Sequence, residues 1–188
     1  MAFDSKAYGQ RVAQILALDH DGNNLISLVA SAPLPDRAAE AQALLSGETP
    51  AGLFPRARAP EEALAGLWLY FSGGEECHKM VQDLASQEAS FWHAIVHRRE
   101  PDADNSAYWF RLVGSHPVFP RLNRAAAEIL HRYPESRFDA GADWDPFRFI
   151  EFCERARRES GSSAEQAALE IQRAEWQLLF DYCARTGA

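Results

Sequence analysis

Cysteine is scarce in this chain, and long apolar runs are absent. The three cysteines among 188 residues, Cys77, Cys153 and Cys183, are too few and too widely spaced for a disulfide framework or a zinc ribbon. The longest run of small or apolar residues, 63–71, is too short to span a bilayer. The first ten residues include Asp4 and lack the apolar centre of a secretory signal. The sequence therefore predicts a reduced, cytoplasmic protein without a membrane partner.

Positive charge is also in short supply. The chain has 19 Lys and Arg residues against 27 Asp and Glu residues, a formal net charge of −8, so we expect no nucleic-acid partner. Residues 91–133 differ, because they hold six arginines, four acidic residues and four of the six histidines. This basic stretch either attracts a small anion or, as the excess of acids favours, pairs with carboxylates from the flanking segments.

Strand patterns are missing, since no segment alternates apolar and polar residues for long. Apolar residues recur instead at the spacing of a helix. The helices predicted from this spacing and from capping residues cover 4–18, 25–30, 36–46, 60–71, 75–84, 87–99, 105–113, 121–131, 146–159 and 163–182. Ser72 and Glu75 have the spacing of a capping box. We predict an all-α, single-domain irregular helical bundle over residues 1–188, with a Pro/Gly-rich connection at 47–60 that buries Leu53 and Phe54.

Residues 91–119 are richer in Trp, His, Arg, Tyr and turn residues than a helical scaffold requires. They read FWHAIVHRREPDADNSAYWFRLVGSHPVF. The segment resembles an uncharacterised family with the signature W-H-A-I-x-H-R-x-E-P-D, followed by N-[AS]-x-Y-W-[FY]-R-x-V-G-x-H-P. The resemblance extends more loosely to residues 65–67 and His78. It implies membership of that family and no particular reaction, because the family is uncharacterised.

Two histidines of this segment share one face of the predicted helix 87–99. At about 100° per residue, His97 lies about 40° from His93, and Glu100 lies about 20° on the other side. Small residues continue the same stripe towards the start of the helix, whereas Phe91 and Ile95 lie near the opposite side. Two imidazoles one turn apart can share a metal ion. The stripe is therefore a candidate ligand surface.

A bare H-x-x-x-H pair needs at least a third metal ligand. His78, one predicted helix earlier, is the best candidate, and His116 and Glu100 follow. Position 94 is Ala, which excludes the H-E-x-x-H pattern of a metalloprotease. A divalent metal site at His78, His93 and His97 is therefore one interpretation of the sequence, and such a metal would permit a hydrolytic or oxidative enzyme.

Two other interpretations stay open at this point. The first is an organic or anionic small molecule bound without metal, between residues 75–100 and 108–119. Its candidate ligand-binding residues are His93, His97, Arg98, Glu100, Trp109, Arg111 and His116. The second is a non-catalytic structural or interaction protein, in which the histidines bond to carboxylates or carbonyls and Arg111 pairs with Asp102 or Glu100. Enzymatic activity and oligomeric state are left open.

Overall fold

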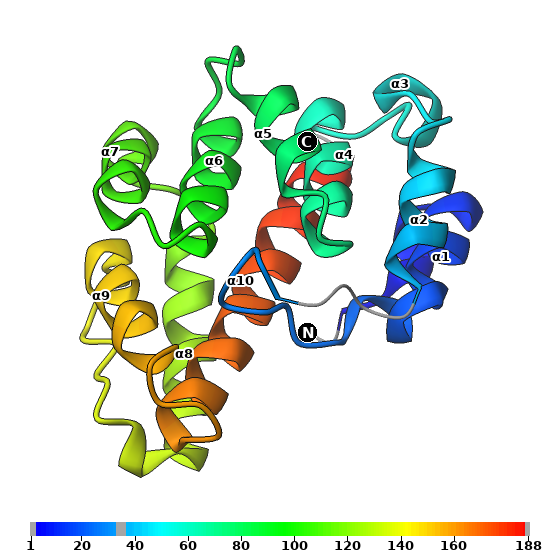
Figure 1. Ribbon diagram of the computed structural model, residues 1–188. Helices are drawn as coiled ribbons and strands as arrows, with labels where there is room; N and C mark the ends of the chain where they lie inside the picture. Colours follow the sequence, from blue (N-terminus) through cyan, green and yellow to red (C-terminus); the bar gives the residue numbers. More distant parts are fainter. Residues whose placement is uncertain (1–2, 33–36, 187–188) are drawn as a thin grey trace.

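Helices joined by loops make up the described chain, residues 3–32 and 37–186 of a computed structural model (Figure 1). The α-helices are α1 (Gln10–Leu16), α2 (Ala38–Leu45), α3 (Pro50–Leu53), α4 (Pro60–Tyr70), α5 (Gly74–Val81), α6 (Gln87–Arg99), α7 (Ala103–Val113), α8 (Phe119–Arg132), α9 (Pro146–Ala156) and α10 (Ser163–Ala184). Three 3-10 helices are η1 (Ser5–Tyr8), η2 (Ala17–Gly22) and η3 (Pro134–Ser136). Within these ranges, β-pairing is limited to one bridge between Ala57 and Thr186, so the all-α prediction is confirmed.

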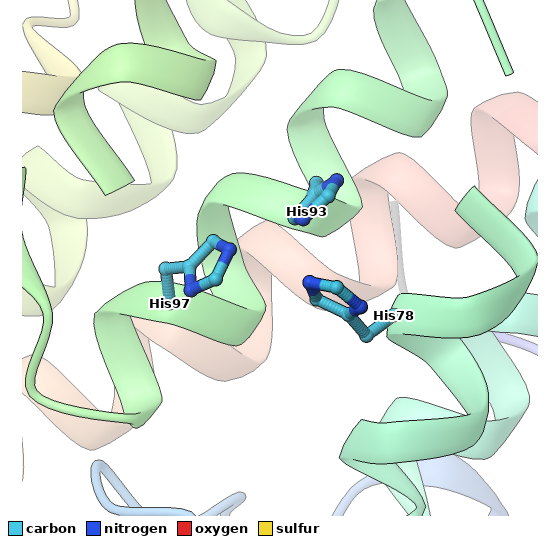
Figure 2. A group of neighbouring side chains, drawn as sticks. All are labelled: His78, His93 and His97. Carbon is cyan, nitrogen blue, oxygen red and sulfur yellow. The ribbon is translucent and has the colours of Figure 1, made fainter. Parts of the chain in front are cut away.

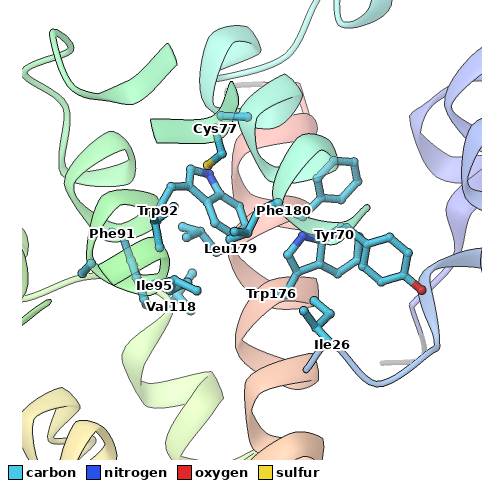
Figure 3. Close-up of a cluster of buried hydrophobic side chains, with 14 of the residues drawn as sticks. Ile26, Tyr70, Cys77, Phe91, Trp92, Ile95, Val118, Trp176, Leu179 and Phe180 are labelled. Carbon is cyan, nitrogen blue, oxygen red and sulfur yellow. The ribbon is translucent and has the colours of Figure 1, made fainter. Parts of the chain in front are cut away.

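The longest helix, α10 with 22 residues, runs through the middle of the molecule beside α4 and α6 (Figure 1). α1, α2 and α3 lie on one side of these helices, and α7 and α9 lie on the other. The buried hydrophobic residues form one cluster, in which Trp92 of α6 and Trp176 of α10 are among the largest fully buried side chains (Figure 3). Leu53 and Phe54 belong to this cluster, as predicted. In the part of the chain described here, no helix is long and apolar enough to cross a membrane.

α6 has the boundaries that the sequence predicts. The Ser86 side chain accepts a hydrogen bond from an N–H in the first turn, and the helix ends at Arg99, just before the residue that precedes Pro101. Asp102 then caps α7 by accepting from the Asn105 N–H at 3.1 Å. The N-cap of α7 is therefore Asp102, and the helix begins at Ala103 rather than at the predicted residue 105. This tight turn brings α7 directly against α6.

The predicted helix at residues 25–30 is wrong, because the segment has no regular structure. Its carbonyl groups find partners on distant helices instead. Gln172 Nε2 of α10 donates to the Ile26 carbonyl at 2.8 Å and to the Ser27 carbonyl at 3.1 Å. Arg99 Nε of α6 donates to the same Ser27 carbonyl at 2.9 Å. These tertiary hydrogen bonds satisfy backbone groups that would otherwise need a helix.

Two further helix starts differ from the sequence prediction. Ser72 does not form a capping box: it has a φ of 62°, and the N-cap of α5 is Gly73, which makes no side-chain cap. The Gly73 N–H donates to the Trp68 carbonyl at 2.7 Å, so these residues serve the turn that ends α4. The predicted helix 4–18 is divided at Gly9, whose φ of 102° favours glycine and separates η1 from α1.

Gly66 allows α4 to lie close to α6 and α10. A Cβ atom at this position would come within 2.7 Å of Trp92 Cζ2, and the Gly66 carbonyl accepts from Trp176 Nε1 at 2.7 Å. Gly66→Ala should therefore lower the free energy of unfolding by about 1–3 kcal/mol, because overpacking outweighs the helix-propensity gain. Urea denaturation measures this change.

Gly74→Ala is the control, because Gly74 is also a helical residue, at the start of α5, and a Cβ atom there meets nothing within 4 Å. It should leave stability unchanged or slightly raised. Equal stability of the two variants would contradict the close packing at Gly66.

Candidate functional site

The side chains of His78, His93 and His97 converge between α5 and α6 (Figure 2). Each offers one ligand nitrogen, and these three atoms all lie within 4.8 Å of one another. The ring centroids are 4.3 Å apart for His78 and His93, 4.9 Å for His93 and His97, and 5.3 Å for His78 and His97. The structure thus places the histidine of α5 opposite the pair on α6.

The two histidines of α6 are shielded from water. His93 is 2% exposed and His97 is 7% exposed, whereas His78 is half-buried. The indole of Trp109 on α7 stacks on the His93 ring, with ring centroids 3.7 Å apart and an angle of 16° between the planes. This stack covers one face of the imidazole and limits its rotation. Trp109 therefore belongs to the site as a positioning residue.

Polar neighbours orient the His97 ring. Its Nδ1 lies 3.0 Å from Oε2 of Glu100, and its Nε2 lies 3.1 Å from Nδ2 of Asn105. A carboxylate next to Nδ1 assigns the proton to that nitrogen, so Nε2 presents a lone pair to the Asn105 amide. A metal ion at Nε2 would take the place of this amide hydrogen bond. Glu100 would then hold the ring as a carboxylate commonly holds a metal-binding histidine.

His93 is held in its neutral form. Burial, followed by the neighbouring charges of His78 and His97, lowers the pKa of His93 to about 3. Its Nδ1 is buried and has no hydrogen-bond partner among the described residues. Burial disfavours the protonated ring, which is the form that attracts an anion most strongly. A metal ion would give Nδ1 a partner that the described residues do not supply.

Arg98 and Arg111 lie apart from the histidine cluster, although the sequence pattern indicated both as candidate ligand-binding residues. The Arg98 guanidinium is buried against α10, where it forms an ion pair with Glu175 and contacts Gln172. Arg111 lies 6.0 Å from the Phe147 ring centroid and does not form the expected pair with Asp102 or Glu100 in the described chain. Arg98 points away because a helix separates adjacent residues by about 100°.

His116 is also outside the cluster. Its Nδ1 accepts from the Val118 N–H at 3.2 Å, and its ring packs against Phe91 with centroids 5.4 Å apart. Its Nε2 lies 3.8 Å from a carboxylate oxygen of Glu88. His116 therefore does not supply a third ligand to the histidines of α6.

Sequence reasoning overlooked Asn105 as a site residue. Asn105 lies in the first turn of α7, where asparagine side chains commonly bond to the local backbone rather than to a ligand. The short turn after Glu100 could have indicated that Asn105 lies near His97, because this turn returns the chain to the end of α6. Cys77, next to His78, is fully buried, and burial raises the pKa of its thiol above the usual range. A buried thiol with a raised pKa is a poor nucleophile.

The fold and the site together define an all-α protein with a shielded cluster of three histidines. No protein-family model matches this chain, and no curated protein or solved structure shows significant similarity to it. The function must therefore be argued from the chemistry of the cluster.

The low pKa of His93 predicts a pH-dependent stability in the metal-free protein. As pH falls below 6.5 the unfolded chain binds a proton at His93, whereas the folded chain stays neutral there until about pH 3. This contribution to the free energy of unfolding is complete above pH 6.5 and is lost as pH falls towards 3. Between pH 7.5 and 5.0, the free energy of unfolding of the wild-type protein should fall by about 1–2 kcal/mol more than that of His93→Gln.

Urea denaturation with EDTA present tests this prediction. His131→Gln is the control, because His131 is exposed and should follow wild type. If the free energy of unfolding of wild type and of His93→Gln changed with pH in the same way, burial of a neutral His93 would not contribute to the pH dependence of stability.

Proposed function

We propose that His78, His93 and His97 bind one divalent first-row transition-metal ion, such as zinc. The observation that carries this proposal is the approach of one nitrogen from each ring to within 4.8 Å of the others. Imidazole nitrogen suits zinc, copper, nickel and iron rather than calcium or magnesium. Three histidines from two adjacent helices form a known kind of protein-ligand set for such ions.

The rearrangement required for binding is small. Zinc–nitrogen bonds of about 2.0–2.1 Å in a tetrahedral site place the ligand nitrogens about 3.3 Å apart. The separations of up to 4.8 Å must therefore shorten by at most about 1.5 Å, which rotation of side-chain torsions provides. His78 is the least buried of the three. We expect this side chain to move most.

The surroundings support a metal ligand set in two ways. Glu100 accepts from Nδ1 of His97, which leaves Nε2 as the nitrogen with a lone pair for an ion in place of the Asn105 amide. The neutral, unpartnered His93 needs no deprotonation before it binds. A bound ion would also give the buried ring a partner that the protein itself does not supply.

Three protein ligands leave one position of a tetrahedral ion for water or a substrate. A metal there would lower the pKa of bound water and permit hydrolytic chemistry. The half-exposed His78 marks the side from which small molecules would enter. Enzymatic activity is thus an extension of the proposal, and a non-catalytic metal-binding protein is the simpler alternative.

We propose further that the protein works in the reducing cytoplasm and belongs to the uncharacterised family that its signature resembles. All three cysteines are free and buried, an arrangement that suits a reducing compartment. The signature contains Trp92, His93, His97 and Glu100, so the proposed site lies inside it.

Metal titration tests the central proposal. Protein freed of any polyhistidine tag and of bound metal should bind one equivalent of Zn²⁺ or Co²⁺ by isothermal titration calorimetry. A hundredfold excess of free Zn²⁺ over Kd should stabilise the fold by about 2.7 kcal/mol, which thermal denaturation detects. Binding should weaken as pH falls through about 6.5, where free imidazoles gain protons.

His78→Ala should weaken Zn²⁺ binding by at least about 100-fold, more than the loss of an outer partner usually causes. His78 is half-buried, so this variant should remain folded. Glu100→Gln should weaken binding by about 10–100-fold, because it loses only the group that orients His97. His131→Ala, which removes an exposed histidine, should bind as wild type does. Absence of stoichiometric binding, or equal affinity of wild type and His78→Ala, would refute the proposal.

A further inference from the structure

A separate cavity of about 740 Å³ lies between α7, α8 and the segment that leads into α9. Its volume is within the range of about 300–1,000 Å³ that small-molecule sites occupy. The aromatic residues that line it are Phe110, Phe119, Trp144 and Phe147. None of the three clustered histidines lines this cavity. It is therefore a second candidate site rather than an extension of the proposed metal site.

Two arginines at the cavity lack acidic partners. Arg111 and Arg124 both line it, and neither forms an ion pair with a carboxylate of the described residues. Other arginines nearby differ: Arg121 pairs with Asp181, and Arg132 pairs with Glu170. Arg111 and Arg124 therefore place two positive charges beside one cavity, and this charge would favour a negative ligand.

Two residues that line the cavity, Trp144 and Asn123, also carry buried polar atoms without partners among the described residues. The indole Nε1 of Trp144 is buried and makes no hydrogen bond within the described chain, and the Trp144 residue is only 7% exposed. Oδ1 of Asn123 is likewise buried and unpartnered, although its Nδ2 donates to the Ala142 carbonyl at 2.8 Å. Buried donors and acceptors are normally satisfied. Because both atoms are closed to solvent in this structure, a molecule in the cavity would reach them only after the side chains turn towards it.

We propose that this cavity binds a small aromatic carboxylate. The aromatic ring lies among Phe110, Phe119 and Phe147, and the carboxylate lies between Arg111 and Arg124. Charge-assisted hydrogen bonds from guanidinium groups to a carboxylate are the strong kind. Asp143 is the one acidic residue along this cavity in the described structure, so the local charge remains positive and selects an anion. The aromatic walls select a flat apolar body over a hydrated inorganic ion.

A matched pair of probes separates the contribution of charge from that of apolar contact. In isothermal titration calorimetry with EDTA present, 2-naphthoate should bind with one-to-one stoichiometry. Its neutral analogue, 2-naphthalenemethanol, should bind at least about tenfold more weakly, because it loses the charge-assisted bonds. Raising the salt concentration should weaken naphthoate binding and leave the alcohol unaffected.

Substitutions assign the binding to this cavity. Arg111→Gln and Arg124→Gln should each weaken naphthoate binding by about tenfold, and the double variant by more. Both side chains are exposed, so the fold should persist. Arg56→Gln is the control, because Arg56 is an exposed arginine that does not line this cavity. Ala142→Trp, at an exposed lining position, should block the cavity and abolish binding.

The proposal is overturned if naphthoate does not bind at millimolar concentration, if the alcohol binds equally well, or if the arginine variants bind as wild type does. His78→Ala separates it from the metal proposal. That variant should lose metal affinity and keep full naphthoate affinity, because His78 does not line the cavity.

Discussion

A fully buried ion pair between Arg98 of α6 and Glu175 of α10 holds the centre of this protein together. The two side chains are 1% and 0% exposed, and the Arg98 Nη1 to Glu175 Oε1 distance is 3.1 Å. Removal of either partner would leave an uncompensated charge in the core, which costs several kcal/mol. The pair also sets the rotation of α6. Because Arg98 lies about 140° around the helix from His93, the histidines must face away from α10.

The candidate metal site follows from that rotation. With Arg98 turned to α10, the opposite side of α6 meets α5 and α7, which supply His78 and Trp109. The same burial that makes the Arg98 pair strong removes water from His93 and lowers its pKa to about 3. α6 thus carries Arg98 of the charged pair on one side and the neutral imidazole of His93 on another. α7 also contributes Phe110 and Arg111 to the separate cavity.

Local patterns in the sequence predicted much of the helical framework and part of the site. The limits of α6 depend on the Ser86 cap and the proline after Glu100, so both could be found from neighbouring residues. The shared face of His93 and His97 follows from helix geometry alone. Residues 25–30 could not be predicted in this way, because their hydrogen bonds come from Gln172 and Arg99. The capping box predicted at Ser72 was wrong for a similar reason, since the turn after α4 determines the conformation of Ser72.

The sequence by itself therefore determined the all-α class, the extent of the main helices and the pairing of two histidines on one face. These properties depend on residues within a few positions of one another, where spacing and capping act directly. Only the tertiary structure decided that Arg98 meets Glu175, 77 residues away, and that His78 joins His93 and His97. It also decided that Arg111 and Arg124 share a cavity. Such contacts depend on how whole helices pack, and packing is set by the complete core rather than by any local pattern.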